Sequence, residues 1–291
     1  MTREEFLALT QAGPVLLDGA TGSNLMKAGM PRGVCAEEWI LAHPDALIAL
    51  QTAYAAAGSR IVYAPTFGAN RYNLSRYGLE AHTREWNRAL VALSRQVPDV
   101  LVAGDVTTTG AALEPNGPMR YDELHEIYTE QISALLEAGV DLLVIETMLG
   151  VNETVVALEA ARSLCELPVL CSMTVQADGS CYFGGDCIEA VETLQALGAD
   201  AVGINCSYGP EQLVSLVRNM KKAAAVPLLV KPNAGMPKIS DTGEAVYPMS
   251  PADFAACMRR LVGEGAAVVG GCCGTTPEFI AALHDTLAEM K

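Results

Sequence analysis

The stretch LLEAGVDLLVIET, residues 135–147, contains the unit from which we expect the fold to be built. A helical segment ends in Ala-Gly, and an apolar run rich in branched side chains follows at once and closes on Glu-Thr. A glycine just past a helix takes up the backbone conformation that ends it, so the run that follows begins a strand. The joints QALGADAVGIN (195–205) and VGEGAAVVGG (262–271) repeat this pattern. The sequence therefore predicts a repeated strand and helix unit.

Eight such apolar runs occur along the chain, and helical segments separate them. Strands this uniformly apolar are typical of a parallel sheet buried on both faces. Eight strand and helix units without a long break favour closure into an α/β fold of the (β/α)8 TIM-barrel type, with an open doubly wound sheet as the alternative. The predicted strands are 14–20, 60–66, 99–106, 141–147, 168–175, 200–206, 227–233 and 266–273, and the predicted helices lie near 44–57, 82–95, 121–138, 152–165, 186–197, 210–224, 251–263 and 277–290.

Length and composition agree with one large domain, residues 1–291, because barrels of this kind use about 250 residues as a single unit. Apolar residues make up 51% of the chain and charged residues 18%, which is enough to build a sizeable core. The formal charge of −15 repels phosphate backbones and anionic lipids, so neither nucleic acid nor a membrane is expected as a partner. The start MTREEFLALTQAG lacks the basic and apolar segments of a signal peptide, so we expect a cytoplasmic protein.

Polar residues that end strands are the best functional candidates, because the carboxyl ends of barrel strands form the active face. Such residues end the first, fourth, sixth, seventh and eighth predicted strands, and we expect them to converge on one mouth. They are Asp18, Glu146, Asn205, Cys206, Asn233, Cys272 and Cys273.

The chain has nine cysteines, an odd number without secretory features, which favours metal binding or buried thiols over disulfides. Four of them lie in apolar segments and are interpreted as small buried hydrophobic residues. Cys181 and Cys187 flank the glycine-rich loop CYFGGDC, where they could approach the mouth, pair on oxidation or merely fill space. The four apolar-segment cysteines are Cys35, Cys165, Cys171 and Cys257.

The remaining three cysteines, Cys206, Cys272 and Cys273, end two strands at the predicted active face. Catalytic zinc keeps three protein ligands and an open fourth position, and these thiols supply that number. Adjacent cysteines point to opposite sides of a regular strand, so Cys272 and Cys273 can share a metal only if the chain turns there. The flanking glycines of VVGGCCGTTP (268–277) permit such a turn. The alternative is again a set of buried thiols.

Taken together, six motifs resemble the homocysteine S-methyltransferase family, which includes the homocysteine-binding module of cobalamin-dependent methionine synthase and betaine–homocysteine methyltransferase. The resemblance runs from about residue 13 to the C-terminus, and the paired cysteines with an upstream Gly-x-Asn-Cys are its most specific part. The motifs are DGATGSNL (18–25), PTFGAN (65–70), IET (145–147), GINCSYGP (203–210), KPNAGMP (231–237) and GGCCGTTP (270–277).

The resemblance implies that Cys206, Cys272 and Cys273 bind Zn²⁺, in agreement with the assignment from strand ends. It also implies that Asp18, Gly19 and Glu146 hold the amino-acid portion of homocysteine. Glu146 is expected to pair with the substrate ammonium and the Gly19 N–H to meet the carboxylate. We expect Asp18 to be a second acceptor for the ammonium. The alternatives are a turn or capping role for Asp18 and a salt bridge at the barrel rim for Glu146.

Asn205 and Asn233 are expected to have different roles. Asn205 is expected to brace its loop rather than bind substrate. For Asn233 we hypothesise that its carbonyl oxygen occupies the open zinc position until substrate arrives. Two loops depart from the family pattern, YAPTFGAN (63–70) and GDVTTTGAALEPNG (104–117), so no donor contacts are assigned to them.

A free alkyl thiol has a pKa of about 8.5, and only its thiolate is a nucleophile, so coordination to zinc is the expected means of activation. No general base is required, and none of the four histidines is assigned to catalysis. Because the chain shows no domain for folate or corrinoid, we expect methyl from a corrinoid on a separate partner protein, with S-methylmethionine, a betaine or methyltetrahydrofolate as alternatives. Two rival interpretations are a non-catalytic structural zinc barrel and a metal-free enzyme that uses Glu146 and Asp18 as acid and base.

Overall fold

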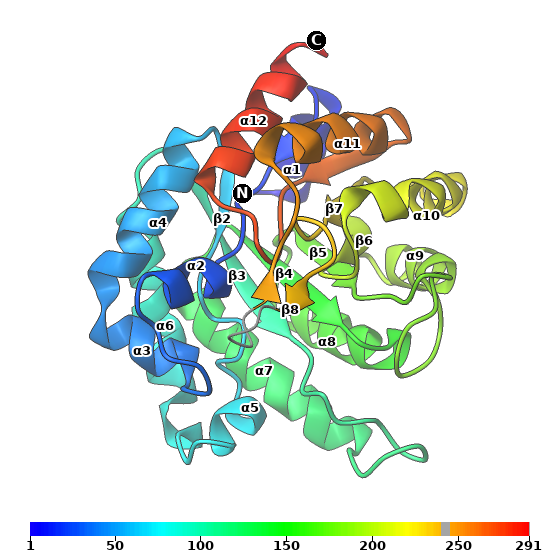
Figure 1. The fold of residues 1–291 in the computed structure, drawn as a ribbon. Coiled ribbons are helices and arrows are strands. Elements are labelled where there is room, and N and C mark those ends of the chain that lie inside the picture. The colour runs from blue at the N-terminus through cyan, green and yellow to red at the C-terminus, as the bar shows by residue number, and fades with distance from the viewer. Residues whose placement is uncertain (240–244, 291) are drawn as a thin grey trace.

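Eight short parallel strands form the centre of the molecule and helices surround them (Figure 1). The computed structural model describes residues 1–239 and 245–290. Hydrogen-bonded neighbours follow the order β1-β10-β7-β6-β5-β4-β3-β2. The strands are β1 (Val15–Leu16), β2 (Ile61–Tyr63), β3 (Leu101–Thr107), β4 (Leu142–Met148), β5 (Val169–Met173), β6 (Ala201–Asn205), β7 (Leu228–Lys231) and β10 (Ala266–Val269).

The two ends of this sheet meet at β1 and β2. Leu17 and Ile61 form a parallel bridge, and the Arg60 N–H donates to the Leu16 carbonyl at 2.7 Å. This contact closes the sheet into a ring. The predicted (β/α)8 barrel and all eight of its predicted strands are therefore confirmed, and the open doubly wound sheet is excluded.

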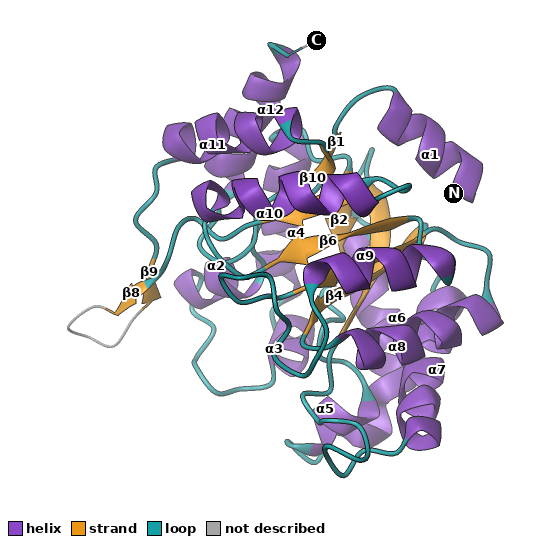
Figure 2. Ribbon diagram, turned by 90° about the vertical axis from the view of Figure 1, so that its right-hand side faces the viewer, coloured by secondary structure: helices purple, strands orange, loops and turns teal. Residues whose placement is uncertain are grey.

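The eight predicted helices are also present, each within about two residues of its expected ends. They form the outer ring of the barrel, as Figure 2 shows from a second side. These helices are α4 (Pro44–Ala56), α6 (Thr83–Ser94), α7 (Tyr121–Glu137), α8 (Val151–Leu164), α9 (Cys187–Ala196), α10 (Pro210–Ala223), α11 (Pro251–Gly263) and α12 (Pro277–Ala288). Among the described residues, no helix is both long and apolar enough to cross a membrane.

Sequence patterns did not predict the shorter elements, which have too few residues to show a helical or strand period. One of them carried a signal: Thr2 and Glu5 form a reciprocal capping box at the start of the first helix. The unpredicted elements are α1 (Arg3–Gln11), α2 (Gly22–Lys27), α3 (Ala36–Ala42), α5 (Arg71–Ser75), the 3-10 turn η1 (Glu80–His82) and the strands β8 (Lys238–Ile239) and β9 (Ala245–Val246).

The strands β8 and β9 pair antiparallel in the segment between β7 and α11. Figure 2 shows this hairpin projecting from the barrel. Its apolar side chains are unusually exposed, with Ile239 at 72% and Val246 at 51%. The hairpin therefore stands at the mouth as an addition to the barrel rather than as part of its core.

Side chains along each strand point alternately into and out of the barrel, and the inward-facing ones fill its interior. Inward-facing apolar side chains form one buried cluster, which includes Ala103, Val144 and Leu229, and Phe6 of α1 joins it. Successive inward positions on a strand are two residues apart. Two residues beyond Ala103, Val144 and Leu229 the inward positions are Asp105, Glu146 and Lys231. The barrel interior thus changes from apolar to ionisable at the carboxyl ends of the strands, which forms a polar floor beneath the mouth.

Candidate metal centre and mouth cavity

A cavity of about 880 Å³ opens at the carboxyl ends of the strands. Its wall includes the segment around α2, the polar floor and the inner side of the β8–β9 hairpin. The predicted site residues that line it are Asp18, Gly19, Glu146, Cys206, Cys272 and Cys273. Residues from strands far apart in the sequence therefore meet at one mouth.

The three cysteines form a compact cluster at the edge of this cavity. Their sulfur atoms all lie within 4.8 Å of one another, and Cys206 Sγ is 3.5 Å from Cys273 Sγ. Within residues 1–239 and 245–290, no histidine, aspartate, glutamate or further cysteine joins this group. Three soft thiol donors with no fourth protein ligand of these types fit a zinc ion that keeps one open position.

The chain turns at the paired cysteines, which is the condition for both thiols to reach one metal. The Cys272 N–H still donates to the Pro232 carbonyl across the strands, at 2.8 Å. The Cys272 carbonyl then accepts from the Thr275 hydroxyl at 2.7 Å. Gly274 takes φ +83°, and a Cβ on it would lie 2.2 Å from Tyr247 Cγ. Only glycine fits this position, so the turn and the packing of Tyr247 over it both depend on Gly274.

The third ligand candidate sits on a constrained backbone. Cys206 has φ +50°, a left-handed conformation that is uncommon outside glycine. Its N–H donates to the Lys231 carbonyl at 3.2 Å. Such conformations cluster at functional sites, because surrounding contacts must hold them.

The proximity of the sulfurs changes their acidity. Hydrogen bonds with Cys206 and Cys272, and a smaller contribution from the Tyr247 hydroxyl, lower the pKa of Cys273 to about 3. The same contacts raise the pKa of Cys272, because its proton is shared with Cys206 and Cys273. A cluster that already stabilises one thiolate suits a divalent soft cation, which would stabilise all three.

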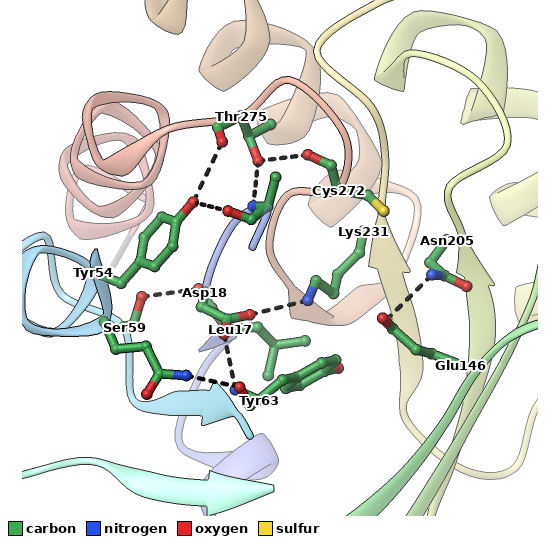
Figure 3. Close-up of polar contacts among 12 residues, drawn as sticks. Leu17, Asp18, Tyr54, Ser59, Tyr63, Glu146, Asn205, Lys231, Cys272 and Thr275 are labelled. Atoms are coloured by element: carbon green, nitrogen blue, oxygen red, sulfur yellow. Dashed lines mark hydrogen bonds and ion pairs between the residues drawn. The ribbon is translucent and has the colours of Figure 1, made fainter. Parts of the chain in front are cut away.

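Asp18 lies on the floor of the site, but its carboxylate is already bonded within the protein (Figure 3). Asp18 Oδ1 accepts from Lys231 Nζ at 3.0 Å, and Oδ2 accepts from the Tyr63 N–H at 2.8 Å. Lys231 Nζ also lies 3.6 Å from the centroid of the Tyr63 ring. Burial alone would lower the pKa of Lys231, but the charge of Asp18, with further contributions from Tyr63 and Glu146, holds it well above its usual value. Lys231 is therefore a buried cation that the sequence analysis did not identify.

Glu146 faces the same cavity from β4. Its Oε2 accepts from Asn205 Nδ2 at 3.2 Å (Figure 3). Burial raises the pKa of Glu146 to about 7, although Lys231 opposes the shift. A carboxyl poised near neutrality can bind an ammonium group in its charged form.

Asn205 braces the end of β4, whereas the sequence led us to expect that it braces its own loop after β6. Its Oδ1 accepts from the Thr147 N–H at 2.9 Å and from Ser172 Oγ at 2.9 Å. Its Nδ2 donates to Thr147 Oγ1 at 2.7 Å. Thr147 has φ +58°, so this network holds a left-handed residue next to Glu146.

Gly19 and Asn233 each offer an unused polar atom. In the described part of the chain, no acceptor takes the Gly19 N–H, and a Cβ there would lie 2.6 Å from the Tyr54 hydroxyl. Asn233 is 6% exposed, yet its Oδ1 has no hydrogen-bond partner among the described residues. The next residue, Ala234, donates its N–H to the Cys273 carbonyl at 2.9 Å. Asn233 is not among the residues that line the mouth cavity, and the hypothesis that it is a resting zinc ligand stays a prediction.

The two loops that depart from the family pattern are tied into the fold. Thr66 in the first loop accepts from the Asp105 N–H at 3.0 Å and donates to the Asp105 carbonyl at 2.8 Å. In the second loop, Thr109 donates its hydroxyl to Glu153 Oε1 at 2.7 Å, and Thr108 bonds to Glu153 Oε2 at 2.5 Å. The threonines of the second loop therefore anchor it to α8.

The other cysteines lie outside the sulfur cluster. All of them are free thiols, and Cys181 and Cys187 are buried without a disulfide between them. Burial raises the pKa of Cys181 to about 12 and that of Cys187 to about 11, so both are protonated.

Comparison with known proteins places this geometry in a family. The family model described as homocysteine S-methyltransferase matches residues 15–287. The chain belongs to the homocysteine S-methyltransferase family. Members of this family that resemble it include the methionine synthases of Mycobacterium tuberculosis, 30% identical over 94% of this chain, and of Mycobacterium leprae, 31% identical over 94%. The chain spans only 24% of the length of either relative.

Solved structures extend the family likeness at the level of fold. The homocysteine methyltransferase MmuM from Escherichia coli, in its metallated form, superposes with a TM-score of 0.80 at 23% identity, covering 96% of this chain and 98% of that chain. Its oxidised form gives a TM-score of 0.79 at 24% identity, covering 94% and 95%. The expected homocysteine S-methyltransferase resemblance is thus confirmed, and the barrel is the family's barrel.

Proposed function

We propose that this chain is a zinc-dependent homocysteine S-methyltransferase that forms methionine. One observation carries the proposal: three thiols from β6 and the turn after β10 meet at a cavity that Glu146 also lines. The three thiols, which would bind the metal, and Glu146, which would bind the amino-acid part of the substrate, therefore line the same cavity. Membership of the family supports the methyltransferase class, while zinc and homocysteine are our assignments.

In this proposal Cys206, Cys272 and Cys273 hold the zinc ion through their sulfurs. Bound zinc supplies the chemistry of thiol activation, because coordination deprotonates the substrate thiol at neutral pH. The protein's task is then orientation: Glu146 accepts the substrate ammonium, and the Gly19 N–H donates to its carboxylate. A substrate held at both ends presents its sulfur in a fixed direction, which displacement at a methyl group requires.

We assign the donor to a methylated corrinoid on a partner protein. The motif resemblance to the cobalamin-dependent module and the two methionine synthase relatives support this choice over S-methylmethionine or a betaine.

A purely structural zinc site is disfavoured by the donor set. Structural sites are almost always closed by four protein ligands, whereas the described residues offer a group of three. The metal-free acid and base alternative is disfavoured as well, because Asp18 is paired with Lys231 and the Tyr63 N–H.

The test combines metal content with turnover. Wild type purified without chelator should hold one zinc per chain, and Cys273→Ser should hold far less, while Cys257→Ser on the outer helix α11 should match wild type. The zinc-loaded protein is then incubated with homocysteine and, separately, methylcobalamin, S-methylmethionine or betaine, and methionine is assayed. Zinc-free wild type would refute the metal assignment, and a zinc protein that neither turns over with any donor nor binds homocysteine would point to another acceptor thiol.

A further inference from the structure

The polar floor contains a second carboxyl that the proposed function does not use. Asp105 lies two residues beyond Ala103 on β3, is 4% exposed and lines the mouth cavity. Its Oδ1 is buried and has no hydrogen-bond partner among the described residues. A buried carboxyl without a donor costs free energy. Because Oδ1 itself is closed off, a ligand in the cavity is expected to donate to Oδ2, which likewise has no hydrogen bond to the described residues.

Asp18, in contrast, has little capacity left for a ligand. Both of its oxygens accept hydrogen bonds from the protein, one from Lys231 and one from the Tyr63 backbone. It is 1% exposed and neutralised by a buried cation. An ammonium group placed beside Asp18 would have to displace Lys231, or would lie beside a like charge.

Asp105 and Glu146 occupy neighbouring strands at the same end of the barrel. In the β3–β4 ladder Asp105 pairs with Val144 and Thr107 pairs with Glu146, so the two carboxyls sit one inward step apart. Burial first, and then the charge of Glu146, raise the pKa of Asp105 well above its usual value. Asp105 and Glu146 share the floor with one cation, Lys231, which already bonds to Asp18, so the negative charge of the two carboxyls is incompletely balanced.

We propose that Asp105 and Glu146 together form the site for the primary ammonium group of the substrate, and that Asp105, not Asp18, is its second acceptor. An ammonium group has three N–H donors and so can serve both carboxyls at once. Lys231 stays paired with Asp18, and the substrate carboxylate is left to the Gly19 N–H. The inference rests on the proposed function, because it takes an amino-acid thiol as the ligand.

The experiment measures binding rather than turnover. Zinc-loaded wild type and Asp105→Asn are titrated calorimetrically with three thiols: L-homocysteine, 4-mercaptobutanoate, which lacks the ammonium, and 3-mercaptopropylamine, which lacks the carboxylate. A charge-assisted hydrogen bond contributes about 1.5–3 kcal/mol, so Asp105→Asn should weaken the two amine-bearing thiols by about 10- to 100-fold. Binding of 4-mercaptobutanoate should change by less than about threefold, which is within the scatter of such measurements.

Controls separate the inference from the proposed function. Glu146→Gln should show the same selectivity for the ammonium, and Asp122→Asn, exposed at the start of α7, should bind all three thiols as wild type does. Asp18→Asn should not selectively weaken the binding of the two amine-bearing thiols. Zinc content and thermal unfolding of each variant establish that it is folded, and Asp105→Ser, a smaller side chain, repeats the titration should the amide variant unfold.

Two results would overturn the inference while leaving the proposed function intact. One is wild-type homocysteine affinity in both Asp105 variants together with a loss in Glu146→Gln. The other is an Asp105→Asn variant that binds L-homocysteine and 4-mercaptobutanoate more weakly but binds 3-mercaptopropylamine as wild type does. If zinc-loaded wild type binds none of the three thiols, the proposed function itself fails.

Discussion

Among the described residues, Lys231 and Asp18 form the ion pair with the least exposed side chains, at 4% and 1%. Replacing Lys231 by Met keeps the volume but leaves the Asp18 charge buried and unpaired. We expect the free energy of unfolding to fall by about 3–5 kcal/mol, measured by urea denaturation. The matched control is Arg218→Met, which breaks an exposed pair with Glu264 and should cost less than about 1 kcal/mol. Equal losses in the two variants would contradict the assignment of a buried charge pair.

Glu146 gives the site a pH dependence. Its carboxyl has a pKa of about 7 in the free protein, and an ammonium ligand favours the charged form. Below this value a proton must leave before the ligand binds, so homocysteine affinity should rise with pH through neutrality. The thiol contributes a rise of its own, because binding to zinc releases its proton.

Comparing two ligands in calorimetric titrations across this range isolates the carboxyl. Affinity for 4-mercaptobutanoate should follow the thiol alone, and the steeper rise for homocysteine should become shallower in Glu146→Gln. Identical slopes for both ligands in wild type would show that the carboxyl does not titrate with binding.

Some site residues could be predicted from the sequence and others could not. The cysteines could be placed because strand ends and a family motif converge on them. Lys231 and Asp105 were missed because a lone charge late in an apolar run normally lies at a solvated rim. Their signal was the spacing of two from Leu229 and Ala103, which predicts an inward side chain only once the barrel's inner face is known.

At the scale of elements, the turn after β10 carries two of the three proposed zinc ligands. Gly274→Ala would place a methyl group 2.2 Å from Tyr247 Cγ in a backbone with φ +83°. A left-handed alanine alone costs about 1–2 kcal/mol, and the clash displaces the turn that brings the two thiols together. We expect at least a tenfold loss of zinc affinity, measured by competition with a chromophoric chelator.

The control for this change is Gly263→Ala. That glycine lies in α11 with nothing within 4 Å of an added Cβ, so the variant should bind zinc normally and gain about 0.5–1 kcal/mol of stability. Unchanged zinc affinity in Gly274→Ala would show that the paired thiols do not need this turn.

The larger elements could be predicted because each strand and helix repeats a pattern long enough to count. The β8–β9 hairpin could not, since each strand has two residues and its side chains are exposed on the outside. Its position at the mouth depends on packing against the turn, where Tyr247 meets Gly274, and no local pattern encodes that contact.

For the whole molecule, zinc should act as a stabilising ligand. A ligand at 1,000 times its dissociation constant adds about 4 kcal/mol to the folded state. Wild type freed of metal should therefore unfold at a temperature several degrees below the zinc-loaded protein in calorimetric scans. Cys273→Ser should show little shift when zinc is added, and a shift equal to that of wild type would mean that the metal binds elsewhere.

The closure of the barrel at β1 and β2 also bears on how the family can diversify. There the main-chain ladder is short, and just past the Leu17–Ile61 bridge the Asp18 carboxylate takes the Tyr63 N–H in place of a carbonyl. One side chain thus serves the wall of the barrel and the charge balance of the floor. A lineage that changes its acceptor substrate through Asp18 must also supply another acceptor for that N–H. Substitutions that alter substrate contacts are less constrained in the loops after β2 and β3, because a new contact there need not replace a hydrogen bond of the barrel wall.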